Sequence, residues 1–119
     1  MAGYVDLFIL PVPKHKIPTY RRISQKMGRI MRRHGATEYR EFLGHDLHVK
    51  KMVSPLTTVK VKKGEVLVFA VVGFRSRAHR DQVNTRTMKD PRVKQICEQP
   101  MFVDMKRMVY GGFSTIVKA

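Results

Sequence analysis

Asp6 is the first residue of this sequence whose type and position suggest chemistry. It lies within residues 4–10, YVDLFIL, an apolar segment that is typical of a β-strand. Side chains alternate along a strand, so Asp6 would share one face with Tyr4 and Phe8. Burying an unpaired carboxylate lowers the stability of the folded protein by a free energy on the order of several kcal/mol. We therefore predict that Asp6 is paired, and the predicted partner is Arg107 on a neighbouring strand.

A ligand pocket between sheet and helices, or inside a dimer barrel, is the first candidate site. The candidate ligand-binding residues are Asp6, Tyr20, His34, Asn84, Arg107 and Tyr110. Either these groups satisfy one another and fix the fold, or they bind a small organic ligand. His34 is either a helix-end histidine bonded to a carbonyl or a titratable group at the pocket rim. As a catalyst, Asp6 would be a base with His34 or Tyr110 as the acid, but no nucleophile–base pair at fixed spacing accompanies them.

Net charge is the second signal. The 119 residues contain 24 Lys and Arg against 9 Asp and Glu, which gives a formal charge of +15. Such a surface attracts polyanions through counterion release, although a solvated helix face or a proteome-wide basic bias would have the same composition. The candidate polyanion-binding residues are Arg21, Arg22, Lys26, Arg29, Arg32 and Arg33. There is no Trp, so we expect nonspecific phosphate contact with nucleic acid rather than recognition of bases.

Metal and disulfide chemistry have little support. Cys97 is the single cysteine, which excludes an intrachain disulfide and metal sites built on several thiolates. His45, Asp46 and His48 have metal-ligand types but lack a helical pattern. We predict no metal and no cofactor.

The elements that must position these residues follow from hydrophobic periodicity. Residues 65–74, EVLVFAVVGF, are apolar on both faces and predict a buried strand. The other expected elements are strands at 4–10, 36–43 and 107–117, and helices at 17–34, from Ser76 to about 89, and from Asp90-Pro91 to Pro100. Residues 45–63 predict a long loop, with a short edge strand at 58–62. Gly111-Gly112 indicate a bulge, or close backbone contact with a neighbour or ligand.

The order of elements is βαββαβ, which predicts one α+β domain, residues 1–119, with a ferredoxin-like fold. The right-handed crossover rule places both helical segments on one face of a four-stranded antiparallel sheet, with 4–10 and 65–74 central. The other face would be apolar and uncovered, which is unusual in a monomer. We therefore predict a homodimer that pairs through this open sheet face.

The chain resembles the YbaA-like family of small bacterial proteins, within the dimeric α+β barrel superfamily. Four stretches carry the resemblance: Tyr4-Val5-Asp6 with Phe8 and Val12-Pro13; Tyr20-Arg21; Arg80-Asp81 with Asn84, Met88 and Asp90-Pro91-Arg92; and Lys106-Arg107-Met108 through Tyr110-Gly111-Gly112-Phe113. The resemblance implies a ferredoxin-like protomer paired through its sheet into a dimeric α+β barrel, and it implies no activity. The superfamily is similar in fold to cofactor-free monooxygenases and isomerases, which is analogy of fold alone.

Three functions therefore remain open. The first is a homodimeric protein that holds a small organic ligand, the second is sequence-independent binding of nucleic acid, and the third is a cofactor-independent monooxygenase or isomerase. The first twenty residues do not resemble a signal peptide, because Asp6, Pro11 and Pro13 interrupt them. No run approaches the ~18 apolar residues of a membrane span, so we expect a cytoplasmic protein with no membrane partner.

Overall fold

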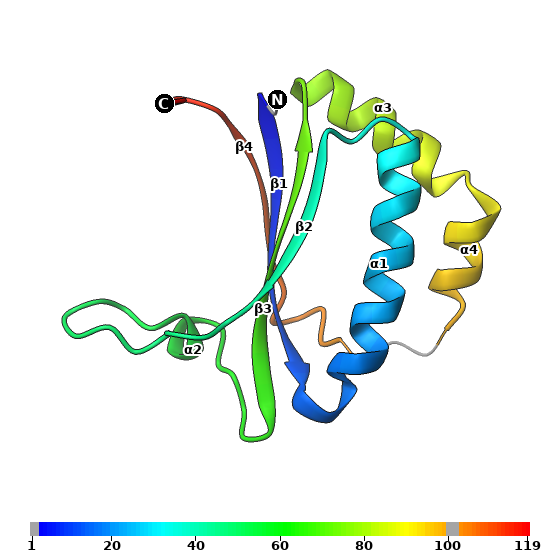
Figure 1. Ribbon diagram of the computed structural model, residues 1–119. Coiled ribbons are helices and arrows are strands. Elements are labelled where there is room, and N and C mark those ends of the chain that lie inside the picture. Colours follow the sequence, from blue (N-terminus) through cyan, green and yellow to red (C-terminus); the bar gives the residue numbers. More distant parts are fainter. Residues whose placement is uncertain (1–2, 100–102) are drawn as a thin grey trace.

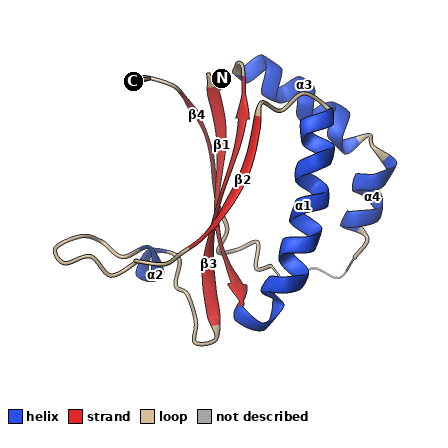
Figure 2. Ribbon diagram, viewed as in Figure 1, coloured by secondary structure: helices blue, strands red, loops and turns tan. Residues whose placement is uncertain are grey.

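The computed structural model describes residues 3–99 and 103–119. The chain folds in the order β1 (Tyr4–Pro13), η1 (Lys14–Lys16), α1 (Ile17–Arg33), β2 (Glu38–Leu43), α2 (Pro55–Thr58), β3 (Glu65–Phe74), α3 (Arg77–Met88), α4 (Pro91–Cys97) and β4 (Val109–Ser114). The strands form one antiparallel sheet with the order β2-β3-β1-β4. Helices α1, α3 and α4 pack on one face of the sheet (Figures 1 and 2). The predicted ferredoxin-like α+β fold and its two central strands are confirmed.

The core lies between these helices and the alternate residues of β1 and β3. Phe74 and Val72 pack with Val83 of α3 and with Ala36 in one buried cluster. Leu10, Val12 and Val68 form a second cluster nearer the other end of the sheet. β1 continues to Pro13, three residues beyond the predicted end. Its pairing with β4 stops at Ile9, so the last part of β1 has an open edge where proline is tolerated.

Helix α1 follows the predicted pattern. Pro18 occupies the first turn, where its missing N–H costs no hydrogen bond, and His34 is the C-cap. Gly35 has φ of +116°, a conformation that favours glycine, and it turns the chain back toward the sheet. Arg32 and Arg33 lie in the last turn, where cations complement the helix dipole.

Three local predictions were wrong. No strand forms over residues 58–62, because the single helical turn α2, capped by the Ser54 hydroxyl, occupies the start of that segment. β2 begins at Glu38 rather than 36, because Ala36 and Thr37 belong to the turn that leaves α1. β4 spans only Val109–Ser114 and has no bulge, since Gly111 and Gly112 pair in regular register with Leu7 and Asp6.

The alternative explanation for the two glycines fits the structure better. A Cβ atom added at Gly112 would collide with the Tyr4 hydroxyl. Glycine is therefore needed at this position because an aromatic side chain of β1 lies across β4. The predicted end of α4 at Pro100 lies outside the described residues.

The sheet face opposite the helices is apolar and has no cover within the described residues. Leu7 and Val71 are paired at its centre, and Phe69 pairs with Phe42. At its margins Phe113 is 53% exposed, Val109 41% and Phe42 39%. The loop that carries α2 and the C-terminal tail both extend toward this side (Figure 1). In the part of the chain that the structure describes, no helix has the length and apolar character needed to cross a membrane.

Candidate functional site

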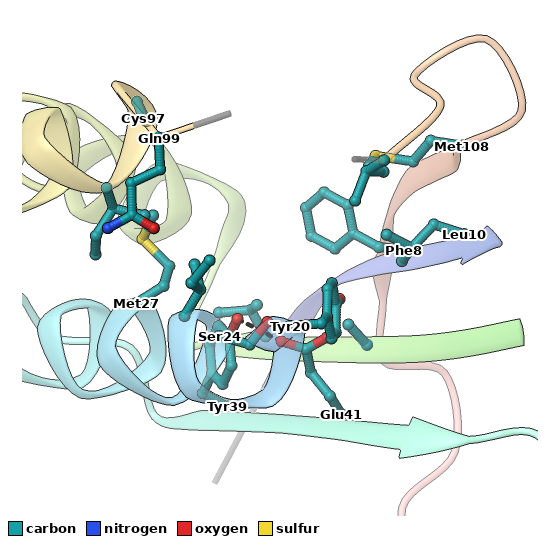
Figure 3. Close-up of a pocket in the computed structure, with 15 residues that line it drawn as sticks. Phe8, Leu10, Tyr20, Ser24, Met27, Tyr39, Glu41, Cys97, Gln99 and Met108 are labelled. Carbon is teal, nitrogen blue, oxygen red and sulfur yellow. Dashed lines mark hydrogen bonds between the residues drawn. The ribbon is translucent and has the colours of Figure 1, made fainter. Parts of the chain in front are cut away.

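A cavity of 240 Å³ lies between α1, α4 and the helix-facing side of the sheet (Figure 3). Most of its wall is apolar. The lining residues from the sheet are Phe8, Leu10, Tyr39, Glu41, Ala70 and Val72. Those from the helices and the segment after α4 are Tyr20, Ile23, Ser24, Met27, Ile96, Cys97, Gln99, Val103 and Met108. Tyr20 is the one predicted ligand-binding residue among them.

A polar cluster of Tyr20, Tyr39 and Glu41 forms one side of this cavity (Figure 3). The Tyr39 hydroxyl donates to Glu41 Oε2 at 2.7 Å, and the Tyr20 hydroxyl donates to Glu41 Oε1. Burial, followed by the Glu41 carboxylate, raises the pKa of both tyrosines well above the ordinary value. Both phenols therefore remain protonated hydrogen-bond donors at neutral pH.

Local structure explains how these three side chains meet. Tyr39 and Glu41 are two residues apart on β2, so they lie on the same face of the sheet. Tyr20 and Ser24 are one turn apart on α1. Gly28 lets the helix approach β2 closely, because a Cβ atom there would lie 2.5 Å from the Tyr39 ring.

Asp6 belongs to a different cluster, and the predicted pair with Arg107 is wrong. Asp6 is 2% exposed, and its Oδ1 accepts from Arg80 Nη1 at 2.8 Å. The same guanidinium group donates to Tyr110 Oη at 2.5 Å and lies over the Tyr4 ring at 5.2 Å. Burial raises the pKa of Asp6, and Arg80 opposes that shift together with hydrogen bonds from Tyr110 and Asn84. Three predicted residues, Asp6, Asn84 and Tyr110, are therefore brought together around an arginine that was not predicted.

Arg107 lies in an ion-pair cluster of its own. It forms two hydrogen bonds with Glu65, at 2.6 and 2.8 Å, and one with Asp104 at 2.8 Å. The hydrogen bond from Arg107 lowers the pKa of Glu65 to about 2. Arg107 lies toward the other end of the sheet from Asp6, since its partner Glu65 pairs with Pro13 whereas Asp6 pairs with Val72.

His34 connects two helices. Its Nε2 lies 2.7 Å from Asp90 Oδ2, and Asp90 is the N-cap of α4. The same carboxylate accepts from Arg92, which lowers the pKa of Asp90. His34 therefore bonds a carboxylate rather than the predicted carbonyl. The predicted catalytic pair of Asp6 and His34 therefore does not form, because His34 is bonded to Asp90. Tyr110, the other predicted acid, does lie beside Asp6.

The arginines of α1 form a groove with the edge strand β2. The arginines that line it are Arg21, Arg22, Arg29, Arg32, Arg33 and Arg40. Five of the six predicted polyanion-binding residues are thus on one surface. The sixth, Lys26, lies in a hollow between α1 and α4 with Arg29, Arg33 and Arg92. Within residues 3–99 and 103–119, no group of three or more His, Cys, Asp or Glu side chains is placed to hold a metal ion.

Glu41 and Arg80 are the important residues that sequence reasoning missed. Alternation over residues 36–43 does place Tyr39 and Glu41 on one face, which was the available signal for the cavity cluster. No local sequence pattern predicts that this face of β2 packs against α1. Arg80 lies on α3, whose weak amphipathic pattern gave no indication that its side chain points toward β1.

Comparison with known proteins places the chain in a family. The model of the family described as protein of unknown function, DUF1428, matches residues 3–105. The protein is 35% identical over 114 residues to the uncharacterized protein YbaA of Escherichia coli K12, covering 96% of this chain and 97% of the relative. The YbaA protein of Shigella flexneri matches to the same extent. Among solved structures, the de novo designed protein Foldit4 aligns with a TM-score of 0.43 and 12% identity, over 97% of this chain and 98% of that one. The chain therefore belongs to the DUF1428 family and is a relative of YbaA.

Proposed function

We propose that this protein binds a small, largely apolar organic molecule in the cavity between α1, α4 and the sheet. The observation that carries the proposal is the cavity itself, which has apolar walls and one convergent polar cluster. Binding sites for small molecules are commonly concave and apolar, with a few polar groups that fix orientation. The volume of 240 Å³ is below the ~300–1,000 Å³ of drug-sized pockets, which favours a compact ligand.

The proposal includes a homodimer that pairs through the open sheet face. The uncovered face of β1 and β3 is a continuous apolar surface flanked by Phe42, Val109 and Phe113. Met52 and Val53, in the loop beside α2, are 73% and 82% exposed, and this loop extends beyond the sheet on the same side (Figure 1). A second copy would cover both surfaces, and a two-fold axis would make the interface self-complementary.

Filling the cavity tests the ligand proposal. Ala70 is buried and lines the cavity, so Ala70→Leu places three extra carbon atoms in the binding space. Indole and phenol are suitable neutral probes, and binding is measured by calorimetry. We expect Ala70→Leu to weaken probe binding by about fivefold to a hundredfold, since overpacking a site costs ~1–3 kcal/mol.

Ala78→Leu is the matched control, because Ala78 is exposed on α3 and outside the cavity. We expect it to bind the probes as the unmodified protein does. Equal binding by both variants would contradict the proposal.

Nucleic acid binding is the second candidate, and the basic groove between α1 and β2 is the observation that favours it. Six arginines line that groove. Affinity that depends on phosphate contacts falls with a slope of about −0.9 per contact in log K against log salt. We expect Arg22→Gln/Arg29→Gln to reduce both affinity and slope for a 20-base-pair DNA duplex in fluorescence anisotropy. Lys50→Gln/Lys51→Gln removes the same net charge from the loop outside the groove; equal loss in both doubles would contradict a specific role for the groove.

A further inference from the structure

The polar cluster of the cavity has more free hydrogen-bond acceptor positions than free donors. The hydroxyl protons of Tyr20 and Tyr39 are both directed at Glu41, one to each carboxylate oxygen. Ser24 lies beside the two phenols, and its hydroxyl partly offsets the raised pKa of both. A carboxylate has about four acceptor positions and no donor, and two of those positions are filled here. The remaining capacity of this cluster is therefore that of an acceptor.

Glu41 also has no direct ion-pair partner among the described residues, although arginines line the groove on its other side. Asp6, Glu65, Asp90 and Asp104 each pair with an arginine, whereas no ion pair among the described residues includes Glu41. No Lys, Arg or His side chain is among the described residues that line the cavity. A negative charge at the wall of an apolar space is stabilised by a cation that binds there, because low polarity strengthens the attraction.

We propose that the ligand is an organic amine, with an apolar body and a protonated nitrogen that donates to Glu41. This inference rests on the proposed function, since it assigns a chemical class to the molecule in the same cavity. Aromatic and aliphatic walls at Phe8, Leu10 and Met27 would contact the body, while the ammonium group would occupy the free acceptor positions of Glu41. An anionic ligand would face the Glu41 carboxylate, and the described residues that line the cavity offer it neutral donors such as the Gln99 amide but no cation.

The arginines of the groove do not make the cavity favourable for an anion, because they line the groove and not the cavity. Tyr20, Ser24, Tyr39 and Glu41 line both the cavity and the groove, so they form the boundary between the two spaces. An anion attracted to the protein has its favourable sites on the arginine side of that boundary. The cavity side has one negative charge and no cationic side chain among the described residues that line it.

A matched series of ligands tests the inference on the unmodified protein. The probes 2-phenylethylamine, 2-phenylethanol and 3-phenylpropionate share an apolar body and differ in their polar group. Affinity is measured by calorimetry, and occupancy is followed through the methyl resonances of Met27 and Met108, which line the cavity. We expect the amine to bind at least about tenfold more tightly than the alcohol, because hydrogen bonds with charged groups are roughly twice as strong as neutral ones. We expect no binding of the carboxylate in the cavity.

Two variants on the same strand locate the effect. Glu41→Gln keeps the shape and removes the charge, and we expect it to lose at least about tenfold in amine affinity while alcohol affinity changes less than about twofold. Glu38→Gln makes the same change on the opposite face of β2 and should leave both affinities unchanged. If Glu41→Gln does not fold, the comparison of the three ligands on the unmodified protein still tests the amine assignment.

The outcomes separate this inference from the proposed function. If the alcohol or the carboxylate occupies the cavity as tightly as the amine, or if Glu41→Gln binds the amine normally, the amine assignment is wrong and the cavity remains a ligand site. If none of the three compounds moves the methyl resonances of Met27 and Met108, and indole and phenol also fail, both proposals are overturned.

Discussion

Asp6 is a carboxylate inside the core, and Arg80 is the group that makes its position tolerable. The side chain of Asp6 is 4% exposed and that of Arg80 12%. We expect Arg80→Ala to lower the free energy of unfolding by about 3–5 kcal/mol, because it leaves a buried charge unpaired. Asp6→Asn/Arg80→Ala should be more stable than Arg80→Ala alone, since a neutral amide is less costly to bury. Urea unfolding of the unmodified protein, Asp6→Asn, Arg80→Ala and the double variant measures this coupling, and strictly additive losses would contradict it.

Glu65 makes the stability of the folded protein depend on pH in the acidic range. Arg107 lowers the pKa of Glu65 to about 2, below the value near 4.5 expected in the unfolded chain. The stabilisation is therefore complete above pH 4.5 and is lost as the pH falls toward 2. We expect the difference in unfolding free energy between the unmodified protein and Glu65→Gln to be larger at pH 6 than at pH 3. A difference that stays constant over this range would show that the ion pair is not its source.

The contact between α1 and β2 builds the polar side of the cavity. Gly28 is buried in the middle of α1 against Tyr39, although alanine would favour the helix by up to ~1 kcal/mol. We expect Gly28→Ala to destabilise the protein by about 1–3 kcal/mol, because the Tyr39 ring must move away from Glu41. The same substitution in a Tyr39→Ala background should become neutral or stabilising. Urea unfolding checks the change of sign, and destabilisation in both backgrounds would contradict this explanation.

The elements also show why part of the molecule was predictable from sequence and part was not. The strand at 65–74 and the helix beginning at Ile17 carry strong periodic signals, and Asp90-Pro91 and Gly35 mark helix boundaries by local chemistry. Long-range contacts have no such local signal. Whether Asp6 meets Arg80 or Arg107, and whether Glu41 lies under α1, depends on how distant elements cross, so the cavity cluster became visible only in three dimensions.

The open sheet face is the surface through which we propose that two copies of the protein assemble. Leu7 lies at the centre of that face, paired with Val71 and Gly111. We expect the protein to sediment at twice its mass of 13.8 kDa, and Leu7→Glu to sediment as a monomer because its carboxylate would be buried in the interface without a cationic cross-strand neighbour. Thr85→Glu adds the same charge on the exposed side of α3 and should remain dimeric. An unmodified protein that sediments as a monomer at micromolar concentration would contradict the dimer.

The cavity is the proposed ligand site, and methionine methyl groups that line it are natural reporters of its occupancy. Met27 and Met108 line it, whereas Met52 and Met88 are 73% and 68% exposed elsewhere. The most direct measurement is a titration of methyl-13C-methionine-labelled protein with indole, phenol and 2-phenylethylamine. We expect saturable shifts of the Met27 and Met108 resonances, with those of Met52 and Met88 unchanged. Resonances of Met27 and Met108 that remain fixed at saturating concentrations of all three compounds would contradict ligand binding in the cavity.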